Sequence, residues 1–305
     1  MGSDYRGRFA PSPTGFLHLG NLWVALISYC AARQAGGKWL LRIEDIDRQR
    51  CREKWEKAIY EDLQELGFEP DEVTPRQQDR CERYQEIIEK WKKLGYVYPC
   101  DCNRARIQKI CSAPHLNEVA IRYDGKCRRS CRHSLAGIPS WRYAGEDRIV
   151  RYRKHGQNEA QVCALQRYKD DIVLQRSDGM YNYQFVVAVD DFDMGVTEVV
   201  RGSDLEDSTP LQVRLIRDLG GIAPIYFHVP LLVDKDGYRL SKRQHGLTWR
   251  DYRAADKSVG EIIGDLLFWA GVNPLREVRT LVDAIQIPLT EWKLDVPFIE
   301  VREHI

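Results

Sequence analysis

A turn near the N-terminus that leads into a helix start constrains the fold of this chain most strongly. Residues 8–21 read RFAPSPTGFLHLGN: an apolar strand end, a Pro/Gly turn and then His18-x-Gly20. A helix start offers unpaired backbone N–H groups and the positive end of the helix dipole, which together bind phosphate. We therefore expect the phosphates of a nucleotide to approach the backbone at Gly20 and to accept a hydrogen bond from His18.

A second motif, far downstream, supplies the positive charge that phosphates need. The turn 234–237 precedes the run Arg239-Leu-Ser-Lys242-Arg243. Cations on a loop at this position can bind the same phosphates as the helix start. Together the two motifs predict a nucleotide site, which His18-x-Gly20 alone would not.

The periodicity of the N-terminal part predicts the opening of a doubly wound sheet. Apolar residues at helical spacing over 22–32 precede a short strand over 39–43, which has the acidic run 44–47 at its carboxyl end. Two amphipathic helices follow over 51–66 and 80–94, and a glycine closes each. A doubly wound sheet binds its ligands at the carboxyl ends of its strands, where these acidic side chains lie.

A second set of strands and helices follows in the C-terminal half. Strands are predicted over 172–176, 185–189, 196–200 and 227–233, and helices over 209–219 and 259–269. Asp190 and Asp191 directly follow the apolar run 185–189. Two carboxylates at a strand end could bind a metal or a ribose, or could cap the next turn, and the sequence leaves these choices open.

The segment from 96 to about 154 is rich in Cys, Pro, Gly and Arg, which predicts an insertion outside the main sheet. Residues 104–154 hold thirteen Lys/Arg and four Asp/Glu, although the formal net charge of the whole chain is only +1. Such a charged run is usually a solvated surface. Cations bind phosphates and rings stack on bases, so RNA is an equal alternative, favoured by the interleaved Tyr123, Trp141, Tyr143 and Tyr152.

The cysteines of the insertion have the spacing of a metal site. Cys100-x-Cys102 is followed by Cys127, Cys131 and His133, and thiolates and imidazole are the ligands of tetrahedral zinc. Spacing alone selects Cys100, Cys102 and Cys127, with either Cys131 or His133 as the fourth ligand. The alternative is that these cysteines are ordinary thiols that bind no metal. A small insertion has little hydrophobic core, so a zinc ion here would be structural.

The composition argues against a secreted or membrane-embedded protein. The chain has 305 residues, 43% of them hydrophobic and 30% charged, and its nine cysteines are an odd number, unlike a disulfide framework. It opens with polar and charged residues and contains no run of about 20 apolar residues. We therefore expect a cytoplasmic protein without a membrane segment.

The motifs, taken in order, resemble those of the class I glutamyl-type aminoacyl-tRNA synthetases. They span residues 6 to about 250 and read RFAPSPTG from Arg8, HLGN from His18, LRIED from Leu41, VDD from Val189, GVTEVVRGSDL from Gly195 and LSK from Leu240. The sequence departs from the family pattern at Asn21, where the family has His, and in the reading RLSKR at 239–243. His18, Gly20 and Lys242 still provide the phosphate chemistry.

The resemblance implies an α/β fold: a class I synthetase Rossmann-like catalytic domain with a zinc-binding insertion and a short helical C-terminal region. The expected parts are the first half of the catalytic domain (1–95), the zinc-binding, basic insertion (96–155), the second half with the Leu-Ser-Lys loop (156–250) and the helical C-terminal region (251–305). It also implies that ATP, with Mg, activates L-glutamate to glutamyl-adenylate before glutamate passes to RNA.

The length of the chain points to one branch of this family. Only 62 residues follow Arg243, whereas full glutamyl-tRNA synthetases carry large helical anticodon-binding domains there. The chain thus resembles the truncated glutamyl-queuosine tRNA(Asp) synthetases, which glutamylate the queuosine base at the wobble position of tRNA(Asp). We expect a monomer that binds the tRNA(Asp) anticodon stem-loop. A minimal glutamyl-tRNA synthetase that charges a tRNA 3′ end, or an inactive RNA-binding paralogue, is the alternative.

The expected site residues follow from ligand chemistry and from the resemblance. His18 and Lys242 would be catalytic and would bind ATP together with Gly20 and Asn21. Glutamate has two carboxylates and an ammonium, so its pocket needs guanidinium groups and an acid, for which Arg8, Arg201 and Glu44 are suited. The resemblance adds Ala10, Ser12 and Tyr183 to this pocket.

The resemblance also selects among the possible metal ligands. The family shows Tyr-x-x-x-Cys after the cysteine pair, as in Tyr123 to Cys127 here. This implies a zinc site of Cys100, Cys102, Tyr123 and Cys127, with Cys131 as the rival fourth ligand.

Overall fold

The structure is a computed structural model that describes residues 4–102, 106, 123–129, 137–146, 148–165, 171–240 and 247–301. Lys242 in the Leu-Ser-Lys loop, and Cys131 and His133 in the insertion, lie outside the described residues. Within the described ranges, no helix is both long enough and apolar enough to cross a membrane.

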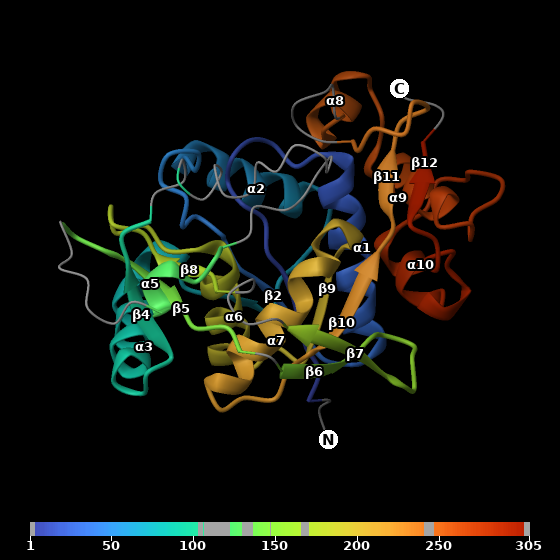
Figure 1. The fold of residues 1–305 in the computed structure, drawn as a ribbon. Helices are drawn as coiled ribbons and strands as arrows, with labels where there is room; N and C mark the ends of the chain where they lie inside the picture. The colour runs from blue at the N-terminus through green and yellow to red at the C-terminus, as the bar shows by residue number, and fades with distance from the viewer. Residues whose placement is uncertain are drawn as a thin grey trace.

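Parallel strands form the centre of the fold (Figure 1). β1 (Arg6–Phe9) pairs with β2 (Lys38–Leu41), β2 pairs with β3 (Glu72–Val73), and β9 (Glu198–Gly202) pairs with β10 (Ile225–Val229). The two groups meet where the backbone N–H of Thr197 donates to the carbonyl of Arg6 at 2.9 Å. β1 therefore has β2 on one side and β9 on the other, which makes it the switch point where such sheets bind ligands.

Helix α1 (Leu19–Gln34) confirms the helix predicted over 22–32 and connects β1 to β2. His18 is its N-cap, and Gly36 follows its C-terminus with φ of 63°, a left-handed conformation that glycine adopts without strain. Eleven of its residues are buried, since the helix contacts β1 and β2 as well as three elements of the later chain: β11 (Leu231–Val233), α10 (Leu281–Gln286) and the 3-10 helix η3 (Leu289–Glu291).

Helices α2 (Glu53–Glu65) and α3 (Cys81–Lys93) confirm the helices predicted over 51–66 and 80–94. Gly67 and Gly95 follow them, both with positive φ, as expected for residues that end a helix. Three short 3-10 helices occur among the described residues: η1 (Gln77–Arg80), η2 (Ser203–Ser208) and η3 (Leu289–Glu291).

The run 185–189, which we predicted to be a strand, is the middle of helix α6 (Tyr183–Asp193). Asn182 caps this helix, because its Oδ1 accepts the backbone N–H of Gln184 at 2.8 Å. The helix is buried from Phe185 to Asp191 and packs on α7 (Thr209–Asp218), which confirms the helix predicted over 209–219. A short helix that is apolar on all sides has no amphipathic period and is easily taken for a strand.

The segment that we expect to be an insertion starts after α3. β4 (Val97–Cys100), β5 (Ser140–Tyr143) and β8 (Val173–Gln175) form an antiparallel sheet, and α5 (Lys126–Arg129) packs against β4. β6 (Arg148–Arg153) and β7 (Ala160–Leu165) form a hairpin, and residue 155 lies in the loop between these two strands. The expected end of the insertion at 155 thus falls inside a hairpin, and β8 adds a later strand to the insertion's sheet.

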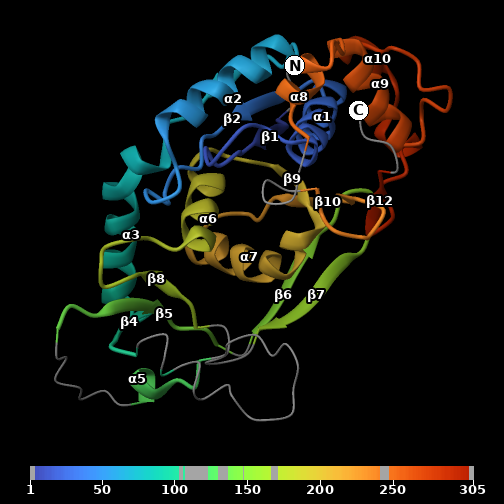
Figure 2. The same cartoon turned by 90° about the horizontal axis from the view of Figure 1, so that it is seen from above.

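The C-terminal region packs beside α1, on the side away from the insertion (Figures 1 and 2). It is largely helical, with α8 (Trp249–Ala254), α9 (Val259–Trp269) and α10 (Leu281–Gln286), and its last strand β12 (Phe298–Glu300) pairs in parallel with β11 (Leu231–Val233). The single strand predicted over 227–233 is therefore two, β10 and β11. They are divided at Pro230, which has no backbone N–H for a continuing strand.

Candidate active site

Two arginines of the first strands meet one carboxylate of α6 at the carboxyl end of the sheet. Arg8 donates through Nε to Oδ1 of Asp191 at 3.2 Å, and Arg42 donates through Nη1 to the same oxygen at 2.7 Å. Arg42 also donates through Nη2 to Oε1 of Glu44 at 3.0 Å. None of these four residues is more than 5% exposed, so the ion pairs lie in a medium of low dielectric, where their geometry is tightly constrained.

Burial and ion pairing oppose each other in this cluster. Burial would raise the pKa of Asp191, but Arg42 and Arg8 outweigh it and hold the pKa below its usual value. At Glu44 burial prevails, so the pKa of that carboxyl is raised despite Arg42 and Arg8. Asp191 therefore stays ionised near pH 7 and is the shared counter-ion of Arg8 and Arg42.

Asp190, the neighbour of Asp191, is held by a different set of donors. Its carboxylate accepts from Nε2 of Gln77 at 2.9 Å, from Nε of Arg80 at 2.8 Å and from the hydroxyl of Tyr84 at 2.9 Å. Both acids therefore lie in a helix and are bonded to protein donors. The sequence predicts both acids at the end of a strand, where they could bind a metal or a ribose or cap a turn. The structure places them inside helix α6 instead.

Arg201 of β9 is a third buried guanidinium, also 5% exposed, but its partners are neutral. It donates to Oε1 of Gln212 at 2.5 Å and to Oγ1 of Thr209 at 2.7 Å, and its Nε lies 3.4 Å from Nε2 of His228. Burial and the Arg201 charge lower the pKa of His228 to about 4, so its imidazole is neutral near pH 7. Within the described part of the chain, Arg201 forms no ion pair with a carboxylate.

A cavity of about 750 Å³ opens beside Glu44. Ser12 and Tyr183, both predicted for the glutamate pocket, line it as well, and Cys102 and Arg142 contribute a wall from the insertion. Tyr183 as a whole residue is 36% exposed, but its phenol is surrounded by protein beside Glu44, and this burial together with the Glu44 carboxylate raises the pKa of the phenol.

The other predicted residues of the glutamate pocket lie next to this cavity. Arg8 and Arg201 are not among its lining residues, but both are buried and lie close enough to act on Tyr183, which does line it. Ala10 is half-buried and follows β1 directly. The structure thus brings the predicted glutamate-binding residues together at one edge of the sheet.

The start of α1 forms a second cleft, of about 180 Å³, that is lined by His18, Gly20 and Asn21. Nδ1 of His18 accepts the backbone N–H of Asn21 at 3.3 Å, while Oδ1 of Asn21 accepts the backbone N–H of His18 at 3.2 Å. Because Nδ1 accepts a hydrogen bond, the proton of the imidazole is on Nε2, which is therefore a donor.

The surroundings of position 20 are tight, so a side chain there would need its neighbours to shift by a few tenths of an ångström. A Cβ there would lie 3.1 Å from the His18 ring and 3.4 Å from the carbonyl oxygen of Leu240. The opposite wall of the cleft includes Asp204 and Arg239, which form an ion pair. Three of the four predicted ATP-binding residues, His18, Gly20 and Asn21, thus line this cleft next to the chain that leads into the Leu-Ser-Lys loop, and the fourth, Lys242, lies outside the described residues.

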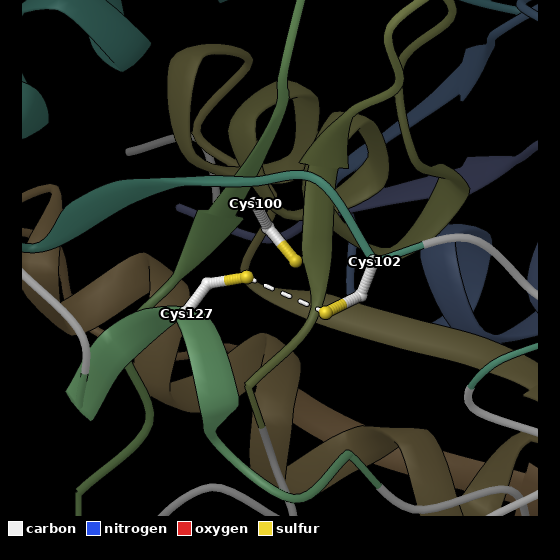
Figure 3. A group of neighbouring side chains, drawn as sticks. All are labelled: Cys100, Cys102 and Cys127. Atoms are coloured by element: carbon white, nitrogen blue, oxygen red, sulfur yellow. Dashed lines mark hydrogen bonds between the residues drawn. The ribbon is translucent and has the colours of Figure 1, made fainter. Parts of the chain in front are cut away.

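Cys100, Cys102 and Cys127 point toward one another in the insertion (Figure 3). Their Sγ atoms all lie within 4.8 Å of one another, and those of Cys102 and Cys127 are 3.4 Å apart. The hydroxyl oxygen of Tyr123 lies 3.7 Å from Sγ of Cys100 and accepts the backbone N–H of Cys127 at 2.8 Å. Three thiols and a phenol in one group fit a borderline-soft divalent ion such as zinc.

Comparison with known proteins places the chain in a family. Residues 4–287 match the family model of tRNA synthetases class I (E and Q), catalytic domain. The chain belongs to this family of class I ligases.

Two relatives of the synthetase are similar over most of their length. It is 40% identical over 283 residues to the Glutamyl-Q tRNA(Asp) synthetase of Nitratidesulfovibrio vulgaris, covering 88% of this chain and 87% of the relative. It is 39% identical over 307 residues to the Glutamyl-Q tRNA(Asp) synthetase of Symbiobacterium thermophilum, covering 92% and 93%. The family predicted from the motifs, and the branch predicted from the chain length, are therefore confirmed.

Other similar proteins are longer than this chain, which covers only part of their length. It is 39% identical over 254 residues to the Glutamate–tRNA ligase of Nitrosomonas eutropha, covering 81% of this chain and 53% of the relative. A crystal structure of a glutamate tRNA ligase from Elizabethkingia meningosepticum, in complex with its amino acid, superposes with a TM-score of 0.79 at 27% identity. The superposition covers 97% of this chain and 67% of that chain. The predicted α/β catalytic domain is therefore confirmed.

Four residues of the synthetase's site had no role in our sequence predictions: Arg42, Thr209, Gln212 and His228. Arg42 did carry a signal, because a cation inside the apolar strand 39–43 must be buried with a partner. The other three carried none, since polar residues are common in a half-exposed helix or strand. Only the fold brings them to Arg201.

Proposed function

We propose that this synthetase activates L-glutamate with ATP and transfers it to the queuosine base of tRNA(Asp). One observation carries the proposal: the matches to two proteins named Glutamyl-Q tRNA(Asp) synthetase, at 40% and 39% identity, extend over 87% and 93% of their lengths. The buried arginines beside Glu44 support glutamate as the amino acid.

Glutamate is suited to the charged groups around the 750 Å³ cavity beside Glu44. Arg8 and Arg201 provide guanidinium groups for its two carboxylates, and Glu44 provides an acid for its ammonium. An ammonium beside Glu44 favours the ionised carboxyl, which offsets the effect of burial on its pKa. Ser12 and the backbone at Ala10 add polar contacts, and Tyr183 closes the pocket.

Activation is an in-line displacement on ATP. A glutamate carboxylate attacks the α-phosphorus, the bond to the bridging oxygen breaks, and pyrophosphate leaves with the electron pair. The protein mainly aligns the reactants and neutralises charge. Nε2–H of His18, the backbone at Gly20 and Asn21, and the ammonium of Lys242 donate to the phosphates, and Mg carried by ATP neutralises further phosphate charge.

A zinc ion would be held by Cys100, Cys102, Tyr123 and Cys127. Its chemistry at this site is structural, because four protein ligands leave no open position for a substrate. Cys102 lines the 750 Å³ cavity, and the Arg142 guanidinium lies 4.1 Å from the centre of the Tyr123 ring. The metal site would therefore stabilise the wall of the cavity formed by the insertion.

Transfer places the RNA at the same cavity. A nucleophilic group of the queuosine base attacks the carbonyl carbon of the adenylate, and AMP leaves. The cavity has the size of a pocket for a ligand larger than an amino acid, and the basic insertion beside it is suited to the phosphates of an anticodon stem-loop. We propose that the synthetase acts as a monomer in the cytoplasm.

Charging of a tRNA 3′ end is a second candidate function, favoured by the 39% identity to the Glutamate–tRNA ligase of Nitrosomonas eutropha. An inactive RNA-binding paralogue is the third.

Exchange of labelled pyrophosphate into ATP, with and without glutamate, tests the activation step that the first two candidate functions share. We expect glutamate-dependent exchange by the wild-type protein and its loss in the Lys242→Ala variant with folding retained. Absence of exchange in the wild type would contradict the proposed function.

A further inference from the structure

We propose that Gln212, together with Thr209 and His228, leaves the charge of Arg201 uncompensated and thereby makes the amino-acid site select an acidic ligand by its net charge. Gln212 is in this sense a positioning and specificity-determining residue. The inference rests on the proposed function in one respect, namely that this site binds glutamate.

The charges of the described site do not balance. Arg8, Arg42 and Arg201 are guanidinium groups, whereas Glu44 and Asp191 are the carboxylates among them, and all five are at most 5% exposed. With every group ionised, the site carries one positive charge. L-Glutamate carries one negative net charge near pH 7, so its complex is neutral. L-Glutamine is net neutral and would leave a buried positive charge, which is costly.

The excess charge lies on Arg201, because its three acceptors are neutral. Gln212 is 1% exposed and Thr209 is fully buried, so water does not compensate the guanidinium on that side. The neutral state of His228 follows from its burial and from the Arg201 charge itself. By contrast, Arg8 and Arg42 share the carboxylate of Asp191.

The charged groups nearby pair among themselves. Arg80 and Arg83 pair with Asp193, Arg80 also pairs with Asp190, and Lys154 pairs with Glu206. Within the described ranges, Arg201 has no carboxylate of its own: Asp191 and Glu206 act on it through space, but each forms its ion pairs with other cations. The ligand is therefore the source of the missing negative charge.

The orientation of Gln212 is fixed from its other end. Its Nε2 donates to Oε1 of Gln184 at 2.6 Å, and Nε2 of Gln184 donates to the hydroxyl of Ser208 at 2.8 Å. The Oε1 of Gln212 is thus directed at Arg201. A glutamate at position 212 has nearly the same shape and would form an ion pair with Arg201, and the Gln184 amide can rotate to donate to the new carboxylate.

Binding of L-glutamate and of L-glutamine to the full chain, measured by calorimetry, tests the inference. We expect wild-type protein to prefer glutamate, and Gln212→Glu to raise the Kd for glutamate by about tenfold or more and to reduce the preference over glutamine by a similar factor. In the exchange assay, Gln212→Glu should raise the KM for glutamate while the KM for ATP stays within about twofold. Gln157→Glu, the same change at an exposed residue outside the site, should behave as wild type.

A second variant covers the case in which a buried acid prevents folding. Gln184→Glu places the acid one hydrogen bond farther from Arg201, at a half-buried position, and should shift the preference in the same direction by a smaller factor. Equal preference ratios in the folded variants and the wild type would overturn the inference, as would equal binding of both amino acids by the wild type. Neither measurement uses RNA, so failure to modify tRNA(Asp) would contradict the proposed function alone.

Discussion

Arg42 and Asp191 are 149 residues apart in the sequence, yet Nη1 of Arg42 lies 2.7 Å from Oδ1 of Asp191, and their side chains are 0% and 1% exposed. The ion pair joins the residue that follows β2 to α6, two elements that lie far apart in the sequence. Through Nη2, Arg42 also orients Glu44 at the wall of the large cavity. One buried guanidinium therefore links the stability of the fold to the geometry of the site.

Removing the Asp191 carboxylate should be strongly destabilising. Asp191→Ala leaves Arg42 and Arg8 without their shared counter-ion, and breaking a buried pair in this way costs about 3–5 kcal/mol. Urea unfolding measures the loss. The matched control is Glu86→Ala, which removes the acid of an exposed pair with Arg83 and should cost less than about 1 kcal/mol. Similar losses in both variants would contradict the structural role of Asp191.

His18 combines two functions that one substitution can separate. In His18→Asn the side-chain oxygen can still cap α1, but the Nε2–H donor is lost, so we expect normal stability and an activation rate reduced by about 100-fold. His18→Ala loses both functions and should lower stability by about 1 kcal/mol as well. Thermal unfolding and pyrophosphate exchange measure the two effects. An Asn variant with wild-type exchange would show that His18 is only a helix cap.

Acidification should destabilise the fold through His228. The pKa of His228 is lowered by burial to about 4, so between pH 6.5 and pH 4 the unfolded chain binds a proton at this residue and the folded chain does not. The free energy of unfolding therefore falls as the pH falls through this window. His228→Gln removes this contribution. Urea unfolding at pH 7.5, 6 and 5 should show a steeper loss for the wild type, and parallel losses would contradict the assignment.

Loss of the metal site should loosen the insertion and leave the central sheet intact. Chelation, or Cys127→Ser, removes a constraint that joins β4 to α5, so we expect faster proteolysis within the insertion. Cys163→Ser, at a half-buried thiol of β7 outside the cysteine group, is the matched control. An unchanged digestion pattern after verified metal removal would contradict a structural role for the metal.

The elements that the sequence predicted correctly are those with local signals. Helix α1 has a cap at His18, an apolar run and a terminal glycine, all within one segment. Helix α6 has no such amphipathic signal, because it is buried from Phe185 to Asp191 and is surrounded by the rest of the fold. Its apolar run therefore looked like a strand until the tertiary structure was known.

The candidate site divides in the same way. Motifs that are contiguous in the sequence predicted His18, Gly20 and Glu44 as site residues, and the cysteine spacing predicted a group at Cys100 whose thiols the structure brings together. The cluster around Arg201 depends on side chains from β9, α7 and β10, and on which of them are neutral. No local pattern encodes that balance of charge, so it could be found only in the assembled structure.

Transfer of labelled glutamate from ATP-activated protein to tRNA tests the central claim most directly. The substrates are tRNA(Asp) with and without queuosine and tRNA(Glu), each with its 3′ end intact or blocked by periodate. We expect label only on tRNA(Asp) that contains queuosine, and expect it to persist when the 3′ end is blocked. Label on tRNA(Glu) that disappears with a blocked 3′ end would show that the protein charges tRNA ends and would contradict our account.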